Sequence, residues 1–125
     1  MRHRVAGIKL GRKKDDRTAL RRILIKQLFE HERIRTTRAK AEAVRGQAER
    51  LITLAKRGNQ AGETGAVNAR RLAAARLGNA QAVKKLFDEI APRFEARQGG
   101  YTRLLSVGLR QGDAAEMVIL ELIEE

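Results

Sequence analysis

The first fourteen residues of the chain carry six lysines and arginines and no carboxylate. Gly7 and Gly11 interrupt this stretch, and no apolar stripe runs through it. Such a segment cannot bury enough apolar surface to offset the entropy that is lost when it becomes ordered. We therefore predict an extended basic arm over residues 1–14 and a single domain over residues 15–125. Each lysine or arginine that meets a phosphate releases a counterion, so the arm is expected to bind a polyanion.

The net charge of +12 lies entirely in the first half of the sequence. Residues 1–57 contain 18 basic and 6 acidic residues, whereas residues 58–125 contain 9 of each. A positive field concentrated in this way indicates a nucleic acid partner first and an anionic membrane second. The chain has no cysteine, no secretory signal and no apolar run long enough to span a membrane. These features favour a cytoplasmic protein without disulfides or thiolate metal sites.

The end of the arm leads into the first predicted helix, over about residues 17–31. Asp15 and Asp16 resemble a catalytic or metal-binding carboxylate pair, but we favour Asp16 as the helix N-cap, with both acids at the positive end of the helix dipole. Helical spacing predicts a buried face on this helix, formed by Leu20, Ile23, Leu24 and Leu28.

A short strand is predicted over residues 33–36, followed by a second helix over about 38–57 that is capped by Thr37. Gly58 is expected to end this helix in a left-handed cap. The glycine-rich residues 58–65 are then predicted to form a flexible loop.

A third helix is predicted over about residues 66–77, with Gly78 ending it and Asn79 capping a fourth. Pro92 predicts that regular helix breaks near Ile90 or Ala91. The fourth helix should bury an i, i+3, i+4, i+7 face made by Val83, Leu86, Phe87 and Ile90.

Two strands are predicted at the C-terminal end, over residues 101–109 and 117–123, joined by a turn at 111–113. The first carries Leu105, Val107 and Leu109 on one face, and the second is apolar on both faces in its middle, which is typical of a central strand. The sequence thus predicts an α+β fold in which about four helices pack on a small three-stranded sheet.

Residues that could support catalysis are sparse. Ser106 is the only serine and lies in mid-strand, and the two histidines, His3 and His31, show no metal-ligand spacing. No phosphate-binding loop of the Gly-x4-Gly-Lys-Ser/Thr type occurs. Aromatic residues make up 3% of the chain, which argues against a stacking platform for single strands. Recognition of folded RNA through phosphate and shape fits better, with no enzymatic activity, cofactor, metal or small-molecule substrate expected.

An ordered series of short motifs resembles the family of bacterial large-subunit ribosomal protein seventeen over nearly the whole chain. No single motif is diagnostic, but the set is highly specific. The matching segments are Met1–Arg4, Arg17–Arg22, His31–Thr37, Leu51–Arg57, Lys85–Phe94, Gly99–Arg103 and Gly112–Ala115.

This resemblance implies an α+β protein without catalysis that binds large-subunit ribosomal RNA near the exit of the nascent-chain tunnel, beside neighbouring ribosomal proteins. Many relatives have Ser-Ser-His where this chain has Lys14-Asp15-Asp16, so no histidine contact with RNA is carried over to that position. The basic arm, the basic faces of the first two helices, the Thr36-Thr37 helix start and the Gly99–Arg103 segment are predicted to contact RNA. The predicted RNA-binding residues are Arg2, His3, Arg4, Lys9, Arg12, Lys13, Lys14, Arg17, Arg21, Arg22, Arg33, Arg35, Thr36, Thr37, Arg38, Lys40, Gly99, Gly100, Tyr101 and Arg103.

Two of these predictions have a simpler structural alternative. Tyr101 is about as well explained as a half-buried strand residue, and the arginines around the first strand as a solvated face. Two other functions also stay open at this point: a sequence-tolerant DNA-binding protein, which would prefer duplex DNA in competition, and an enzyme acting on RNA, which would turn RNA over.

Overall fold

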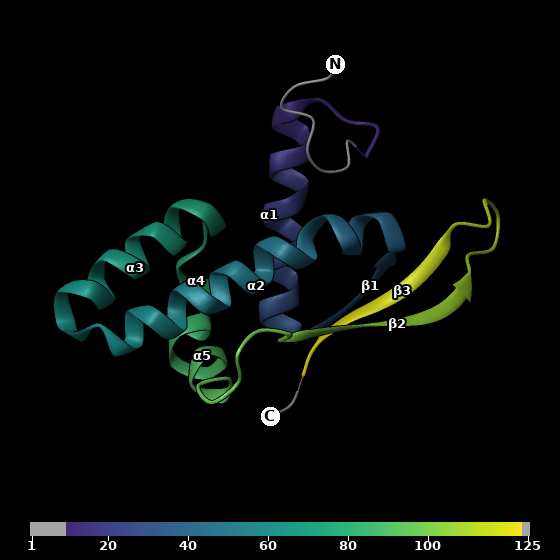
Figure 1. Cartoon of the computed structure of the whole chain (residues 1–125). Helices are drawn as coiled ribbons and strands as arrows, with labels where there is room; N and C mark the ends of the chain where they lie inside the picture. The colour runs from purple at the N-terminus through teal and green to yellow at the C-terminus, as the bar shows by residue number, and fades with distance from the viewer. Residues whose placement is uncertain (1–9, 124–125) are drawn as a thin grey trace, which may run out of the picture.

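A computed structural model describes residues 10–123 of the chain and shows helices packed against one face of a three-stranded antiparallel sheet (Figure 1). The α4, η1 and α5 segments follow one another without a break, so the helices form four rods, of which α1 and α2 pack on the sheet while the others pack on these two. The predicted α+β class is confirmed for the described residues. The elements are α1 (Lys14–His31), β1 (Arg33–Thr37), α2 (Arg38–Gln60), α3 (Gly62–Leu77), α4 (Ala80–Lys85), the π-helical η1 (Leu86–Ile90), α5 (Ala91–Arg93), β2 (Thr102–Leu109) and β3 (Glu116–Leu122).

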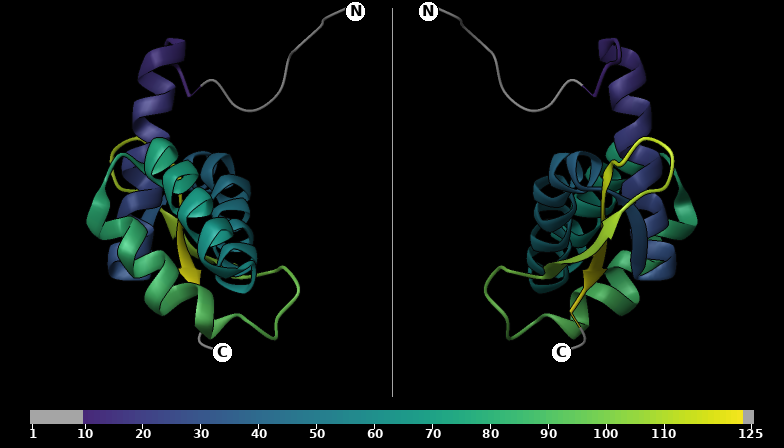
Figure 2. Two further views of the ribbon diagram at one scale, coloured as in Figure 1. Left: turned by 90° about the vertical axis from the view of Figure 1, so that its left-hand side faces the viewer. Right: turned by 90° about the vertical axis from the view of Figure 1, so that its right-hand side faces the viewer.

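The first helix begins earlier than predicted. Lys13 occupies the N-cap position without a side-chain capping bond, so the predicted Asp16 cap is wrong, although both aspartates lie in the first turn. The buried face is also rotated from the predicted one: Ile25 is buried, whereas Ile23 is 52% exposed. The first turns of α1 rise clear of the other helices in all views (Figures 1 and 2), so tertiary packing selects a buried face only farther along the helix.

Residues 58–65 are helical apart from Ala61, so the predicted loop is wrong. Gly58 lies inside α2, where a Cβ atom would come within 2.4 Å of the Ala69 Cβ atom of α3. Glycine thus serves close helix packing at this position and does not cap the helix. Packing of the two helices outweighs the low helix propensity that made this stretch look like a loop.

The irregularity predicted near Ile90 or Ala91 takes the form of the π-helical segment η1, which ends at Ile90, but the chain does not leave the helix there and stays helical through Arg93. The widened turn of η1 directs the Ala91 amide to the Leu86 carbonyl, and Pro92 has no amide hydrogen to offer the Phe87 carbonyl in the same i, i+5 pattern. Asn59 supplies the missing donor through its Nδ2 atom, 2.9 Å from the Phe87 oxygen. A side chain from α2 thereby satisfies the carbonyl that the proline leaves without a backbone partner.

Two predicted caps and the burial of the fourth helix are confirmed. The Asn79 side chain accepts a hydrogen bond from the Ala82 amide, and Gly78 ends α3 in the left-handed conformation. The predicted face of the fourth helix is fully part of the core, with Phe87 1% exposed.

Strand β3 lies at the centre of the sheet, in the order β1-β3-β2, as predicted. Its side chains at Val118, Leu120 and Leu122 are buried beneath the helices. Strand β2 pairs with β3 in an antiparallel hairpin, but an irregularity between Ser106 and Gly108 disrupts its alternation. Leu105 lies before this irregularity and already points away from the core face that carries Thr102 and Leu104. The predicted apolar face of this strand does not enter the core, and its three residues are exposed: Leu105, Val107 and Leu109.

Candidate nucleic-acid interface

The outer face of the sheet presents basic side chains on its two edge strands, β1 and β2, on either side of an acidic residue of the central strand β3. Glu121 of β3 pairs with Arg33 of β1 on one side and with Arg103 of β2 on the other. The Nε and Nη2 atoms of Arg103 lie 2.8 and 2.6 Å from the Glu121 Oε1 atom, and the Arg33 Nη2 atom lies 3.8 Å from its Oε2 atom. One carboxylate thus serves both predicted RNA-binding arginines and reduces the positive field of this face.

Arg38, at the start of α2, is also paired with acids. It donates to the carboxylates of Glu116 at 2.8 Å and of Glu42 at 3.0 Å. The hydrogen bond to Glu116, followed by that to Glu42, raises the pKa of the Arg38 guanidinium further above its ordinary value. Two other predicted residues, Arg35 on β1 and Lys40 in the first turn of α2, lie nearby, with Arg35 exposed on the same face as Arg33.

The predicted threonine site is only partly presented to solvent. Thr36 is buried, with 8% of its surface exposed, so it offers little surface for the predicted contact with RNA. The Thr37 hydroxyl accepts a hydrogen bond from the Lys40 amide at 3.4 Å, which confirms the predicted cap. This hydroxyl already closes the helix, so its first role is structural.

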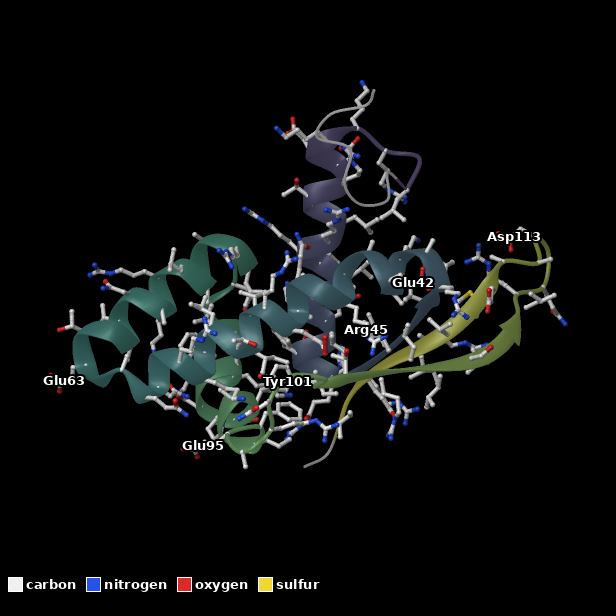
Figure 3. The ribbon with its side chains drawn as sticks, in the orientation of Figure 1. Glu42, Arg45, Glu63, Glu95, Tyr101 and Asp113 are labelled. Atoms are coloured by element: carbon white, nitrogen blue, oxygen red, sulfur yellow. The ribbon has the colours of Figure 1, made fainter. Side chains whose placement is uncertain are left out.

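Tyr101 is buried below α2 at the start of the hairpin (Figure 3), which favours its structural alternative over the predicted contact with RNA. Its hydroxyl accepts a hydrogen bond from Lys56 at 3.0 Å and contacts the Thr53 hydroxyl at 3.4 Å, while its amide donates to Glu49 at 2.9 Å. Burial acts to raise the pKa of the Tyr101 hydroxyl, but the hydrogen bonds, led by that from Lys56, outweigh it and lower the pKa below its usual value. Tyr101 therefore anchors the hairpin to α2.

The Gly99-Gly100 pair before this tyrosine remains open. Both residues have positive φ angles, +80° and +62°, and no atom lies within 4 Å of the position of an added Cβ. Positive φ explains why glycine occupies these positions. The exposed backbone permits the close approach that the sequence predicts.

A second basic region, not predicted as a unit, lies where α1, α2 and α3 meet. A cleft of about 330 Å³ is lined by four arginines from the three helices, Arg21 and Arg22 of α1, Arg50 of α2 and Arg76 of α3. Thr18, Ile25, Gln47 and Leu51 complete the lining, so no aspartate or glutamate of the described chain lines this cleft. We call these four arginines the cleft arginines.

Sequence reasoning identified only the two cleft arginines of α1. Arg50 and Arg76 are 26 residues apart in sequence, and they meet because α2 and α3 pack side by side, with Gly58 against Ala69. Leu51, next to Arg50, lies seven residues before Gly58, and Arg76 lies seven residues after Ala69. Seven residues are two helical turns, so in this antiparallel pair of helices both positions are equally far from the contact between Gly58 and Ala69. Because the predicted loop ended α2 early, the sequence offered no signal for this alignment.

The remaining predicted residues lie near or beyond the start of α1. Arg12, Lys13 and Lys14 are exposed, and Arg17 is half-buried. Four others lie outside the described residues: Arg2, His3, Arg4 and Lys9.

Residues 10–123 contain neither a candidate metal site nor a candidate membrane-spanning helix. This range contains no cluster of three or more histidine, cysteine or acidic side chains that is arranged to hold a metal ion. In the same range, none of the helices has both the length and the apolar character that crossing a membrane requires.

Comparison with known proteins gives a consistent match. The family model described as ribosomal protein L17 matches residues 20–123. The chain is 49% identical over 125 residues to the large ribosomal subunit protein bL17 of Pelobacter propionicus, covering all of this chain and 93% of that protein. It is 50% identical over 123 residues to the bL17 of Koribacter versatilis, covering 98% and 72% of the two chains. The bL17 of Symbiobacterium thermophilum is 51% identical over 115 residues, with 92% and 96% covered.

Proposed function

Because the chain belongs to the ribosomal protein L17 family, we propose that it binds and stabilises folded ribosomal RNA in the bacterial large ribosomal subunit. Its role in the ribosome is structural, and it is not an enzyme. RNA binding and the place of the protein in the subunit are the parts that we infer.

The distribution of charge is the observation that carries this proposal. The net charge of +12 lies in residues 1–57, which include the arm, α1, β1 and most of α2. The α1 helix carries Lys14, Arg17, Arg21 and Arg22 on or next to the first turns that rise clear of the body (Figure 1). A projecting basic helix can enter a groove between packed RNA helices, where phosphates crowd together and need neutralising cations.

We further infer a position near the exit of the nascent-chain tunnel, in contact with neighbouring large-subunit proteins and in the cytoplasm. These details rest on the family resemblance of the ordered motifs. The exposed apolar residues of β2 leave surface for such neighbours, while the cleft arginines and the arm face RNA.

Co-sedimentation tests the proposal directly. The tagged protein, expressed in its own bacterium, should travel with the large subunit in a sucrose gradient after a moderate salt wash. In a purified system, it should bind large-subunit ribosomal RNA more tightly than duplex DNA of equal length at the same salt concentration. Equal affinity for the two nucleic acids, together with release from the subunit in the wash, would contradict the proposed function.

The basic arm is proposed to clamp the RNA. Deletion of residues 1–14 removes six basic residues and none of the described core, so the shortened protein should keep its fold. If all six meet phosphates, the slope of log affinity against log salt should decrease in magnitude by up to roughly 4–5 units. An unchanged affinity and slope would show that the arm does not bind RNA.

A further inference from the structure

We propose that the cleft between α1, α2 and α3 binds the phosphates of an RNA strand through the four cleft arginines. This inference rests on the proposed function and assigns part of it to a particular site. Arg50 and Arg76 belong to this site although the sequence did not point to them.

The cleft is built by three helices whose positions are set by packing and not by the cleft itself. Arg21 and Arg22 line it together with Ile25, whose side chain is 4% exposed and anchors this stretch of α1 in the core. Leu51, 3% exposed, does the same for α2 beside Arg50, and Leu77, also 3% exposed, for α3 beside Arg76. Each basic residue thus neighbours a buried residue on its own helix, and the arginine backbones are held in place before any ligand arrives.

One cleft arginine is also positioned by a bond across the helices. The Arg22 Nη2 atom donates to the Ala75 carbonyl oxygen of α3 at 3.1 Å. Ala75 lies in the last turn of α3, where carbonyl oxygens carry the negative end of the helix dipole and attract a cation. This bond spans the cleft wall from α1 to α3 and leaves other guanidinium N–H groups of Arg22 available, because an arginine has five donors.

The electrostatics of the cleft favour an anion. Four guanidinium groups share a concave surface whose described lining contains no carboxylate. Like charges in a concavity with low-dielectric walls reinforce one another and raise the local concentration of anions. Asp15 lines only the shallow depression on the neighbouring side of Arg22.

The chemistry of the lining favours the phosphate of a polynucleotide. A guanidinium group matches two phosphate oxygens at once, and Thr18 and Gln47 add neutral hydrogen-bonding groups. Thr18 and Arg21 of the cleft lining belong to α1. The N-terminal turns of this helix project from the body (Figure 1), so a strand that follows the helix passes over the cleft.

Two pairs of substitutions test whether RNA binding depends on the cleft arginines themselves or only on the net charge of the protein. Arg50→Gln with Arg76→Gln removes two exposed cleft arginines from α2 and α3. The matched control, Arg57→Gln with Arg71→Gln, removes two exposed arginines from the same helices outside the cleft and changes the net charge equally. Both proteins are titrated with large-subunit ribosomal RNA over a salt series, after circular dichroism has shown equal helix content.

The cleft pair should lose about tenfold or more in affinity, and its salt slope should decrease by up to about 1.8 units, two contacts at 0.9 each. The control should lose less than about threefold. The lysine version, Arg50→Lys with Arg76→Lys, keeps the charge but not the bidentate geometry and should fall between the wild type and the glutamine pair. If the wild type binds but the cleft pair and the control lose affinity equally, or neither loses any, the cleft is not a phosphate site. If the wild type shows no preference for large-subunit ribosomal RNA over duplex DNA, the proposed function is overturned instead.

A crosslink locates the RNA independently of affinity. The chain has no cysteine, so Thr18→Cys at the cleft and Gln111→Cys at the hairpin turn each create a single attachment point for a photoactivatable group. With equal labelling, the first protein should crosslink to ribosomal RNA at least several times more strongly, and the glutamine pair should abolish that difference. Equal crosslinking from both positions would contradict the proposal.

Discussion

The arginines of this protein occupy two regions that differ in the acids around them. On the outer face of the sheet, Arg33 and Arg103 share Glu121, and at the start of α2 Arg38 is held between Glu42 and Glu116. In the cleft, four arginines converge and no aspartate or glutamate of the described chain lines the site. The number of arginines in a segment therefore does not identify an anion site, because a carboxylate on a neighbouring strand can neutralise those arginines.

The two regions also differ in what holds them in shape. The sheet face is held by the backbone pairing of three strands and by the packing of Val118, Leu120 and Leu122 of β3 beneath it. The cleft depends on how closely α2 and α3 approach each other, and therefore on Gly58, Ala69 and Phe87. Substitutions in the packing should damage the cleft before the sheet, while substitutions of acids should change the sheet face alone.

The largest effect is expected from Phe87→Ala. Phe87 is 1% exposed beneath α2 and α3, and its ring faces the Arg70 guanidinium at 4.8 Å. Truncation leaves a cavity and should lower the free energy of unfolding by about 3–5 kcal/mol. Denaturant titration measures the loss, and a change within error of zero would show that the α2–α3 packing does not depend on this ring.

Two glycine substitutions in α2 should have opposite signs. Gly58→Ala places a Cβ atom 2.4 Å from that of Ala69 and should destabilise the protein by about 1–3 kcal/mol through overpacking. Gly46→Ala, where no atom lies within 4 Å, should stabilise it by roughly 0.5–1 kcal/mol through helix propensity. Thermal unfolding of both variants is the measurement. If both substitutions stabilise the protein, α2 and α3 can move apart to accept the added Cβ atom without loss of stability.

A smaller effect is expected on the sheet face from Glu121→Gln. Loss of this carboxylate frees Arg33 and Arg103, so affinity for large-subunit ribosomal RNA should rise about threefold and the salt slope by up to about one unit. Glu95→Gln, an exposed glutamate beyond α5 (Figure 3), changes the net charge equally and serves as the control. An equal rise in both variants would assign the effect to net charge and remove the distinction between the two regions.

The smallest effect concerns the tip of the hairpin, where Asp113 pairs with Arg110 (Figure 3). Hydrogen bonding from Arg110, with the Ala115 amide, lowers the pKa of the Asp113 carboxyl from 3.8 to about 2. A lowered folded-state pKa contributes stability above pH 3.8, and that contribution is lost as the pH falls through about 2. In a carboxyl-carbon NMR titration, Arg110→Gln should move the midpoint up toward 3.8, and an unchanged midpoint would exclude the pairing.

Much of the fold could be predicted because it depends on local patterns. The Thr37 and Asn79 caps, the Gly78 helix end and the central place of β3 each follow from a residue type or a short periodicity. Such signals act over a few residues, and tertiary packing reinforces them here.

Packing between segments distant in sequence decided the rest. Gly58 and Pro92 carry strong local signals for helix breaks, yet both lie within helices. At Gly58 the two helices α2 and α3 approach so closely that a Cβ atom would collide with Ala69, and near Pro92 the Asn59 side chain donates a hydrogen bond to the Phe87 carbonyl. The burial of Tyr101 also depends on packing between distant segments, since only the folded chain brings Lys56 to its hydroxyl.

The sequence by itself determined the family, the α+β class and the concentration of charge in residues 1–57, because composition and ordered motifs are properties of the chain. Only the tertiary structure decided which basic residues are paired with acids and which converge. Glu121 lies 88 residues from Arg33, and Arg76 lies 54 residues from Arg22. Electrostatic fields depend on distance in space, and these distances exist only once strands and helices have packed.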